Sequence, residues 1–159
     1  MHVENIDHKR FLSEMEVRAD LSVDSASLGS EIFMNWEQIK EMKKAGMAIG
    51  SHTHSHQILK QLEADEQEYE LKTSKEILEQ LLGCNIKSIA YPVGIQNSFS
   101  DVTKKLAEQT GYEMAFSCFG GVGIEDKMDM KRYSVDTFVT YPMFRVMAQM
   151  NLRFGGSIC

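Results

Sequence analysis

Helical and strand-like patterns alternate along the chain from Asn35 onward, whereas the first 34 residues show no sustained hydrophobic period. The small polar residues at 20–30 are typical of a loop. Behind Asn35, apolar residues recur at helical spacing, and Asn35 can cap this helix with Gln38 as its third residue. Gly46 marks the end of the helix, and the apolar run at 47–50 then predicts a short buried strand.

A second helix is predicted to begin at a capping box formed by Asp65 and Glu68 and to end at Gly83. One face of this helix carries the residues expected to pack inward, which are Leu71, Ser74, Leu78 and Leu81. The remaining surface is rich in Glu and Lys, and we expect it to face solvent.

The same alternation continues to the end of the chain. The pattern predicts a strand at 86–90 that runs into a turn at Pro92 and Gly94. A helix capped by Ser100 follows, with Val102, Leu106 and Ala107 expected inside. After it, the pattern predicts a strand at 112–119, a last strand at 132–138 and a helix at 143–154. Strands that alternate with helices favour an α/β fold, with a parallel sheet and crossover helices. Ligand sites in such folds lie at the carboxyl ends of the strands.

Length and charge indicate the number of domains and exclude one class of partner. The 159 residues fit one domain, 1–159. The net charge of −6, from 17 basic and 23 acidic side chains, argues against a nucleic-acid partner, because phosphate contacts need clustered cations.

The cysteines and the absence of long apolar runs bear on disulfides, metal sites and cellular location. The three cysteines, Cys84, Cys118 and Cys159, form no CxxC pair, so neither a disulfide framework nor a thiolate zinc site is expected. Neither a signal peptide nor a membrane span is evident, so a cytoplasmic location is expected for the chain as given.

Three of the five histidines lie within "IGSHTHSHQ", at His52, His54 and His56. In an extended backbone all three would point to one side, whereas in a helical turn His52 and His56 would share a face. Either geometry can hold a divalent metal through two imidazoles, and zinc, iron, nickel and cobalt all suit such ligands. A His52–His54 pair at a strand end, as in amidohydrolases, is therefore an alternative to the pair of His52 and His56.

Three stretches in order, "NWEQIKEMKKAGMAIGSHTHSH", "AYPVG" and "LAEQTGYEMAFS", resemble the polysaccharide deacetylase family, also called carbohydrate esterase family 4 or the nodulation-protein-B homology domain. The resemblance covers about Asn35 to Asp136. It implies an incomplete or distorted (β/α) barrel and a hydrolase that removes acetyl groups from the N-acetylated sugars of a glycan. A divalent metal is implied as cofactor, most readily zinc, with cobalt or nickel as alternatives.

The resemblance also assigns residues to roles. His52 and His56 match the metal ligands, Thr53 matches the hydroxyl residue after the first ligand, and His54 matches no ligand.

The family's second motif falls on the turn after the strand at 86–90. There the resemblance makes the Val93 backbone N–H an oxyanion donor. The neighbouring residues of the motif, Tyr91, Pro92 and Gly94, are placed in the substrate-binding turn.

Several family features are missing. Ala90 stands where the family has an Arg, and no histidine follows His56. The aspartates before Asn35 are Asp7, Asp20 and Asp24, and none belongs to a Thr-Phe-Asp-Asp motif, so the general base stays unassigned. We expect a shortened deacetylase, which would make an envelope location possible. The alternative is a degenerate member that binds glycan or metal without turnover. The sequence leaves the oligomeric state open.

Overall fold

The computed structural model describes residues 8–20, 29, 32–118, 125–132 and 139–154. The chain falls into two compact units, Met1–Ala45 and Gly46–Cys159, and each is described by itself. A single domain across 1–159 stays a prediction.

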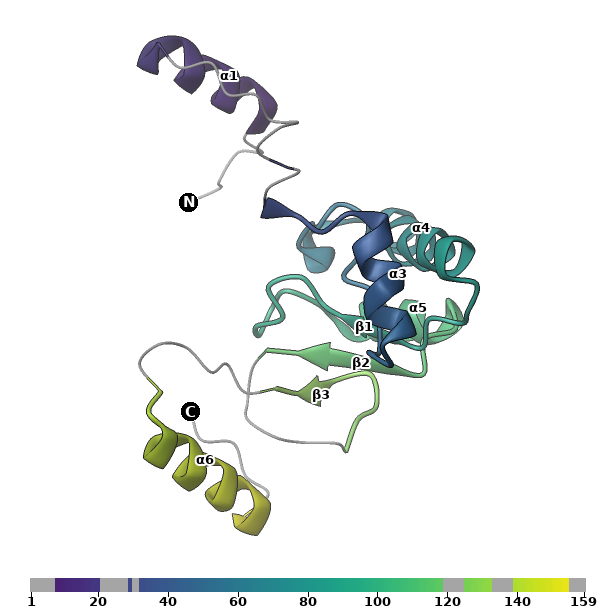
Figure 1. The fold of residues 1–159 in the computed structure, drawn as a ribbon, viewed down its shortest axis with the longest axis vertical. Helices are drawn as coiled ribbons and strands as arrows, with labels where there is room; N and C mark the ends of the chain where they lie inside the picture. The colour runs from purple at the N-terminus through teal and green to yellow at the C-terminus, as the bar shows by residue number, and fades with distance from the viewer. Residues whose placement is uncertain (1–7, 21–28, 30–31, 119–124, 133–138, 155–159) are drawn as a thin grey trace. The chain divides into compact units, whose positions relative to one another are not determined.

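The first unit contains α1, His8–Ala19, and α3, Trp36–Lys44 (Figure 1). The Asn35 side chain accepts a hydrogen bond from the Gln38 N–H at 2.9 Å, and the Gln38 side chain accepts one from the Asn35 N–H at 2.9 Å. The predicted capping box is therefore confirmed. Helix α1 was not predicted, because its sequence carries many charged residues and no long apolar stripe.

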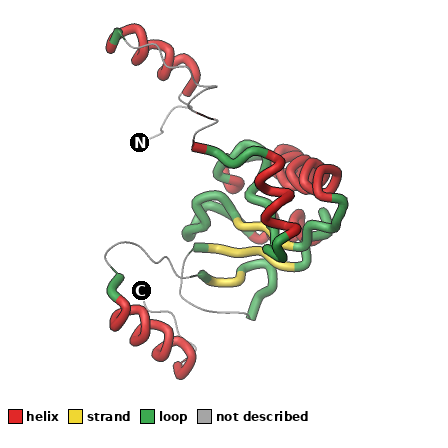
Figure 2. The backbone as a smooth tube through the Cα atoms, viewed as in Figure 1, coloured by secondary structure: helices red, strands yellow, loops and turns green. Residues whose placement is uncertain are grey.

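In the described part of the second unit, three parallel strands form a sheet in the order β1-β2-β3 (Figures 1 and 2). They are β1, Ser88–Ala90, β2, Met114–Ser117, and β3, Met130–Lys131. Ile89 lies opposite Ala115 in the register of β1 and β2. The parallel sheet and its crossover helix confirm the α/β prediction. The sheet formed by the described strands is open, as expected of an incomplete barrel.

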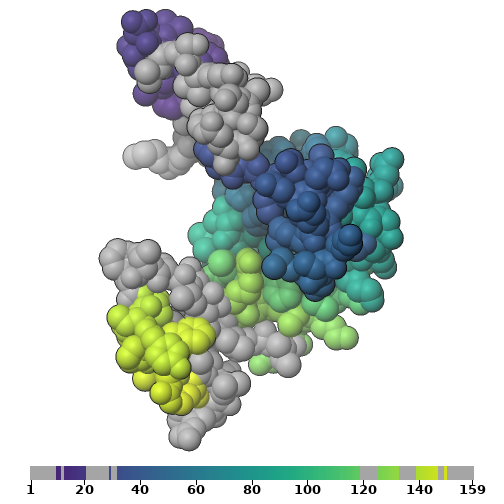
Figure 3. Space-filling view, in the orientation of Figure 1, coloured from purple at the N-terminus to yellow at the C-terminus, as the bar shows by residue number. Residues whose placement is uncertain are grey.

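Two helices pack against each other in this unit, α4, Ala64–Leu82, and α5, Asp101–Gln109, and α5 also contacts β2. Ahead of α4 lies a short 3-10 helix, Leu59–Gln61. Figure 3 shows the atoms of this part of the chain in teal and green.

Helix α4 differs from its prediction at its start. The N–H of Glu63 donates to Glu66 Oε2 at 2.9 Å, so the box lies two residues before the predicted Asp65 and Glu68. The predicted end is confirmed, since Gly83 adopts a left-handed φ of +60° that glycine tolerates.

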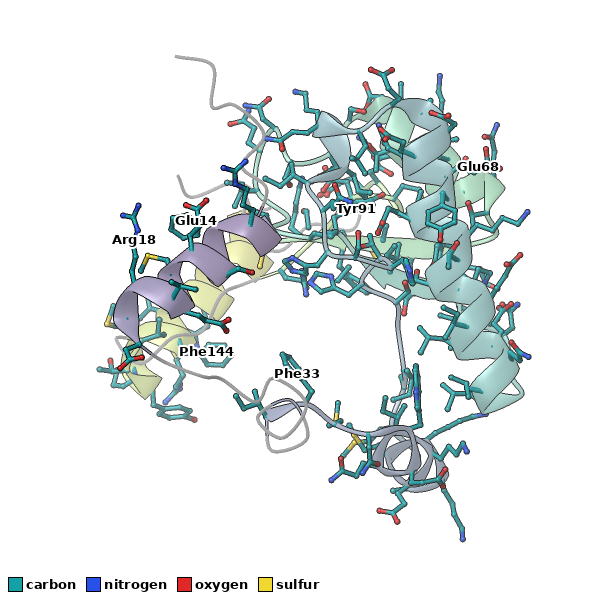
Figure 4. The ribbon with its side chains drawn as sticks, turned by 90° about the horizontal axis from the view of Figure 1, so that it is seen from above. Glu14, Arg18, Phe33, Glu68, Tyr91 and Phe144 are labelled. Atoms are coloured by element: carbon teal, nitrogen blue, oxygen red, sulfur yellow. The ribbon has the colours of Figure 1, made fainter. Side chains whose placement is uncertain are left out.

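The charged surface of α4 is not all exposed, so that prediction is wrong. Glu68 is exposed and lies on the outer side of the helix (Figure 4). Glu70 and Lys75, in contrast, are 4% and 8% exposed. Lys75 can be buried because its Nζ lies 2.9 Å from Glu79 Oε1 and donates to the Ile86 carbonyl.

Helix α5 is rotated relative to its prediction. Ser100 caps it, as expected, by accepting from the Thr103 N–H. Val102, expected inside, is 50% exposed. The adjacent Thr103 is buried instead, because its hydroxyl donates to Gln67 Oε1 on α4 at 2.7 Å.

Residues 47–50 lie within the described range and form no strand, contrary to the prediction. Parallel pairing is confined to Ser51, whose N–H donates to the Ser88 carbonyl and whose carbonyl accepts from the Ala90 N–H, both at 2.9 Å. Gly50 runs so close to β1 that an added Cβ would lie 2.7 Å from Ser88 Oγ. One bridged residue therefore holds the histidine loop on the sheet.

The C-terminal part confirms one prediction. Helix α6, Tyr141–Phe154, begins two residues before the predicted 143–154. Of the predicted strand 132–138, Arg132 follows β3 and 133–138 lie outside the described residues. None of the described helices is long and apolar enough to cross a membrane.

Candidate functional site

The histidine loop leaves the sheet at the carboxyl end of β1. Because Ser51 pairs in parallel with Ile89, the residues that follow Ser51 run alongside those that follow β1. Ser51 itself is buried, and its hydroxyl lies 2.6 Å from the Ser74 hydroxyl on α4. Strand pairing and this helix contact together position the start of the loop.

His52 and His56 are the two histidines that the loop brings together. Their ring centroids lie 4.7 Å apart, with the ring planes at 77°. Nδ1 of His52 lies 2.7 Å from the Ala90 carbonyl, which can only accept, so Nδ1 carries the proton. In the neutral ring the lone pair of His52 is then on Nε2. Metal-bound histidines commonly donate their second ring nitrogen to a carbonyl in this way.

His54 points elsewhere. Its ring packs edge-on against Tyr69 of α4, with centroids 5.9 Å apart and planes at 90°. The neighbouring residues Thr53 and His56 have positive φ, +68° and +59°, in the left-handed region that β-branched residues rarely adopt. This bend of the backbone separates His54 from His52 and His56.

The turn after β1 carries Val93. Val93 has φ +62°, and the Gly94 N–H donates to the Pro92 carbonyl at 2.6 Å across it. Within the described part of the chain, the Val93 N–H has no acceptor. Gly94 is needed here, because an added Cβ would lie 2.9 Å from the Cys118 backbone nitrogen. The turn thus presents one open N–H and is tied to the end of β2.

Tyr91 and Pro92, at the start of this turn, are buried. Tyr91 lies in the interior of the second unit (Figure 4), its ring stacked on Phe99 at 4.4 Å and its hydroxyl donating to the Met128 carbonyl at 2.9 Å. Burial, with nearby Asp129 and Asp126, raises the pKa of Tyr91 far above its ordinary value, so it stays a neutral donor. Contact of this turn with substrate stays a prediction.

Glu70 of α4 was missed by the sequence reasoning. Its carboxylate accepts from the N–H groups of His54 and Ser55, at 2.9 and 2.7 Å, and from the Ser55 hydroxyl at 2.5 Å. Burial raises the pKa of Glu70, but the bonds from Ser55 and His54 outweigh it and hold that pKa below its ordinary value. Helical spacing could have located Glu70, since it lies four residues before the inward-facing Ser74.

Two imidazoles with this spacing can reach one divalent ion, and the protonated Nδ1 of His52 fits such a site. Catalytic zinc sites usually have three protein ligands. Among the described residues, no group of three His, Cys, Asp or Glu side chains is placed to hold an ion.

Comparisons with known proteins agree with this fold. The polysaccharide deacetylase family matches residues 11–115, which begins before the expected Asn35 and ends before Asp136. A protein of Bacillus subtilis (strain 168) named YxkH and assigned to the polysaccharide deacetylases is 31% identical over 116 residues, which are 73% of this chain and 40% of that protein.

Among solved structures, the deacetylase PplD of Streptococcus pyogenes, in complex with acetate, has a TM-score of 0.69 at 25% identity, over 89% of this chain and 65% of that chain. A de-N-acetylase from Aggregatibacter actinomycetemcomitans has a TM-score of 0.64 at 19% identity, over 73% and 53% of the two chains, and so shares the fold. The chain thus spans less than two thirds of the length of each of these relatives. Because the family match covers residues 11–115, the chain belongs to the polysaccharide deacetylase family.

Proposed function

We propose that this chain is the metal-binding part of a hydrolase that removes acetyl groups from the N-acetylated sugars of a glycan. The observation that carries the proposal is the pairing of His52 with His56, in which the Ala90 carbonyl fixes Nδ1 of His52 and leaves Nε2 for an ion. Zinc is the preferred metal, and cobalt or nickel suit the same imidazoles.

The reaction is hydrolysis of an amide, which needs an activated water and a donor for the developing oxyanion. A bound divalent metal supplies the first by lowering the pKa of a water molecule. The Val93 N–H is the proposed oxyanion donor, since it lies on the turn next to Ala90 and is open among the described residues. Acetate, bound by PplD, is the product that such a reaction would release.

Acetate release from N-acetylglucosamine oligomers tests the proposal. With added zinc or cobalt we expect release that a chelator stops and that His52→Ala abolishes. His54→Ala is the matched control, because its ring packs on Tyr69, and it should keep most of the activity. A folded chain that releases no acetate with either metal, or an active His52→Ala, would contradict the proposal.

A second candidate is a glycan-binding protein of the same fold that has no turnover. Ala90 favours it, because the family's Arg at this position is absent from the sequence. Binding of N-acetylglucosamine oligomers without acetate release, measured by calorimetry, would support this candidate. Turnover that is lost in His52→Ala would exclude it.

A further inference from the structure

We infer that Glu70 is a positioning residue for the metal site, holding the loop between His52 and His56 in the shape that lets both rings reach one ion. The inference rests on the proposed function. It concerns a helix residue outside the histidine loop and the turn after β1.

The contacts of Glu70 fall on the segment between the two proposed ligands. Three hydrogen bonds, from the His54 N–H, the Ser55 N–H and the Ser55 hydroxyl, converge on its two oxygens at 2.5–2.9 Å. Bonds to an ionised carboxylate are among the strong ones. Because Glu70 is buried on α4, its own position is set by the helix and not by the loop.

The loop has a conformation that needs such support. Thr53 and His56 both occupy the left-handed region, where a side chain is unfavourable. The other hydrogen bonds within the loop are longer. They run from the His56 N–H to Thr53 Oγ1 at 3.2 Å, from the Thr53 N–H to Ser51 Oγ at 3.4 Å and from Gln57 Nε2 to Ser55 Oγ at 3.2 Å. Glu70 therefore supplies the shortest hydrogen bonds to the segment that sets the distance between the rings.

Glu70 acts on the ligands through the backbone. Its oxygens already accept three bonds from His54 and Ser55, so we assign it no place among the metal ligands. Groups that orient metal ligands typically change metal affinity 10- to 100-fold when they are removed. An effect of this size on affinity is the expected signature of Glu70.

Zinc titration of the chain by calorimetry tests the inference, with the unfolding midpoint measured on every variant. Glu70→Ala should lower the zinc affinity at least about tenfold. Glu70→Gln should recover most of the affinity, since the amide oxygen can still accept from both N–H groups and the amide nitrogen can donate to the Ser55 hydroxyl. Recovery by Gln separates positioning by hydrogen bonds from a need for charge.

Glu79→Ala is the matched control. Glu79 lies on the same helix and also accepts a backbone N–H, that of Ile86 at 2.9 Å, but it does not touch the histidine loop. It should lower the unfolding midpoint and leave the zinc affinity unchanged. Equal loss of affinity in Glu79→Ala and Glu70→Ala would overturn the inference, because general destabilisation would then explain both.

Ser55→Ala covers the case in which Glu70→Ala fails to fold. It removes one of the three bonds to Glu70, together with the longer bond from Gln57, and leaves α4 intact. The zinc affinity should therefore fall about two- to tenfold. Parental affinity in the folded Glu70 and Ser55 variants would overturn the inference alone. A parent chain that binds no zinc, or a His52→Ala variant that binds as tightly as the parent, would overturn the proposed function and the inference with it.

Discussion

Replacing Gly94 with alanine should damage the turn that follows β1 more than a glycine replacement elsewhere. Gly94 has φ +66°, which costs a side chain about 1–2 kcal/mol. The new Cβ would also lie 2.9 Å from the Cys118 backbone nitrogen, which is closer than real contacts allow, and 3.1 Å from the Cys118 Cβ, which is tight. Relief of that contact must move the bond from the Cys118 N–H to the Gly94 carbonyl, now 2.7 Å, at a cost of about 0.5–1.5 kcal/mol.

The free energy of unfolding should therefore fall by about 1.5–3.5 kcal/mol in Gly94→Ala. Gly83→Ala is the control, since Gly83 has a similar φ of +60° and an added Cβ would meet nothing within 4 Å. Its loss should be about 1–2 kcal/mol, from the backbone alone. Urea unfolding with linear extrapolation measures both. Equal losses would refute the close approach of the turn to β2.

Three further predictions concern the contacts of α4 with the rest of the second unit. Lys75→Met should lower the free energy of unfolding by about 1–3 kcal/mol, because it leaves the buried Ile86 carbonyl and the Asn85 side chain without the ammonium group that donates to them. Urea unfolding checks this, and a change below about 0.5 kcal/mol would contradict these contacts. The hydrogen bonds from Lys75 and from the Ile86 N–H hold the pKa of Glu79 below its ordinary value in the folded chain. The stabilisation by Glu79 is therefore complete above its unfolded-state pKa and is lost as the pH falls through its folded-state pKa. Glu79→Gln should flatten the acid side of the plot of unfolding midpoint against pH, and an unchanged slope would contradict this role of Glu79. Ser74→Ala should lower the free energy of unfolding in urea by about 1–3 kcal/mol, since it leaves the buried Ser51 hydroxyl without its partner at 2.6 Å. Ser55→Ala should lower it less, because Ser55 is exposed.

The fold class and the histidine pair could be predicted because they depend on local signals. Helical spacing behind Asn35 and the glycine at Gly83 gave two helix ends that the structure confirms. The family motifs led to the expectation of an incomplete barrel, which agrees with the open parallel sheet.

The errors arose where tertiary contacts outweigh local pattern. The apolar run at 47–50 reads as a strand, but only Ser51 finds a partner on β1. Val102 is more apolar than Thr103, yet Thr103 is buried because its hydroxyl donates a hydrogen bond to the Gln67 side chain. Glu70 and Lys75 look like solvent residues until the loop and the carbonyl that they bind are known.

Anomalous diffraction from crystals grown with zinc tests the central claim most directly. The account predicts one peak at about 2.0–2.1 Å from a ring nitrogen of both His52 and His56, with the His54 ring turned toward Tyr69. A peak held by His52 and His54, or full zinc occupancy elsewhere with none at this loop, would contradict it.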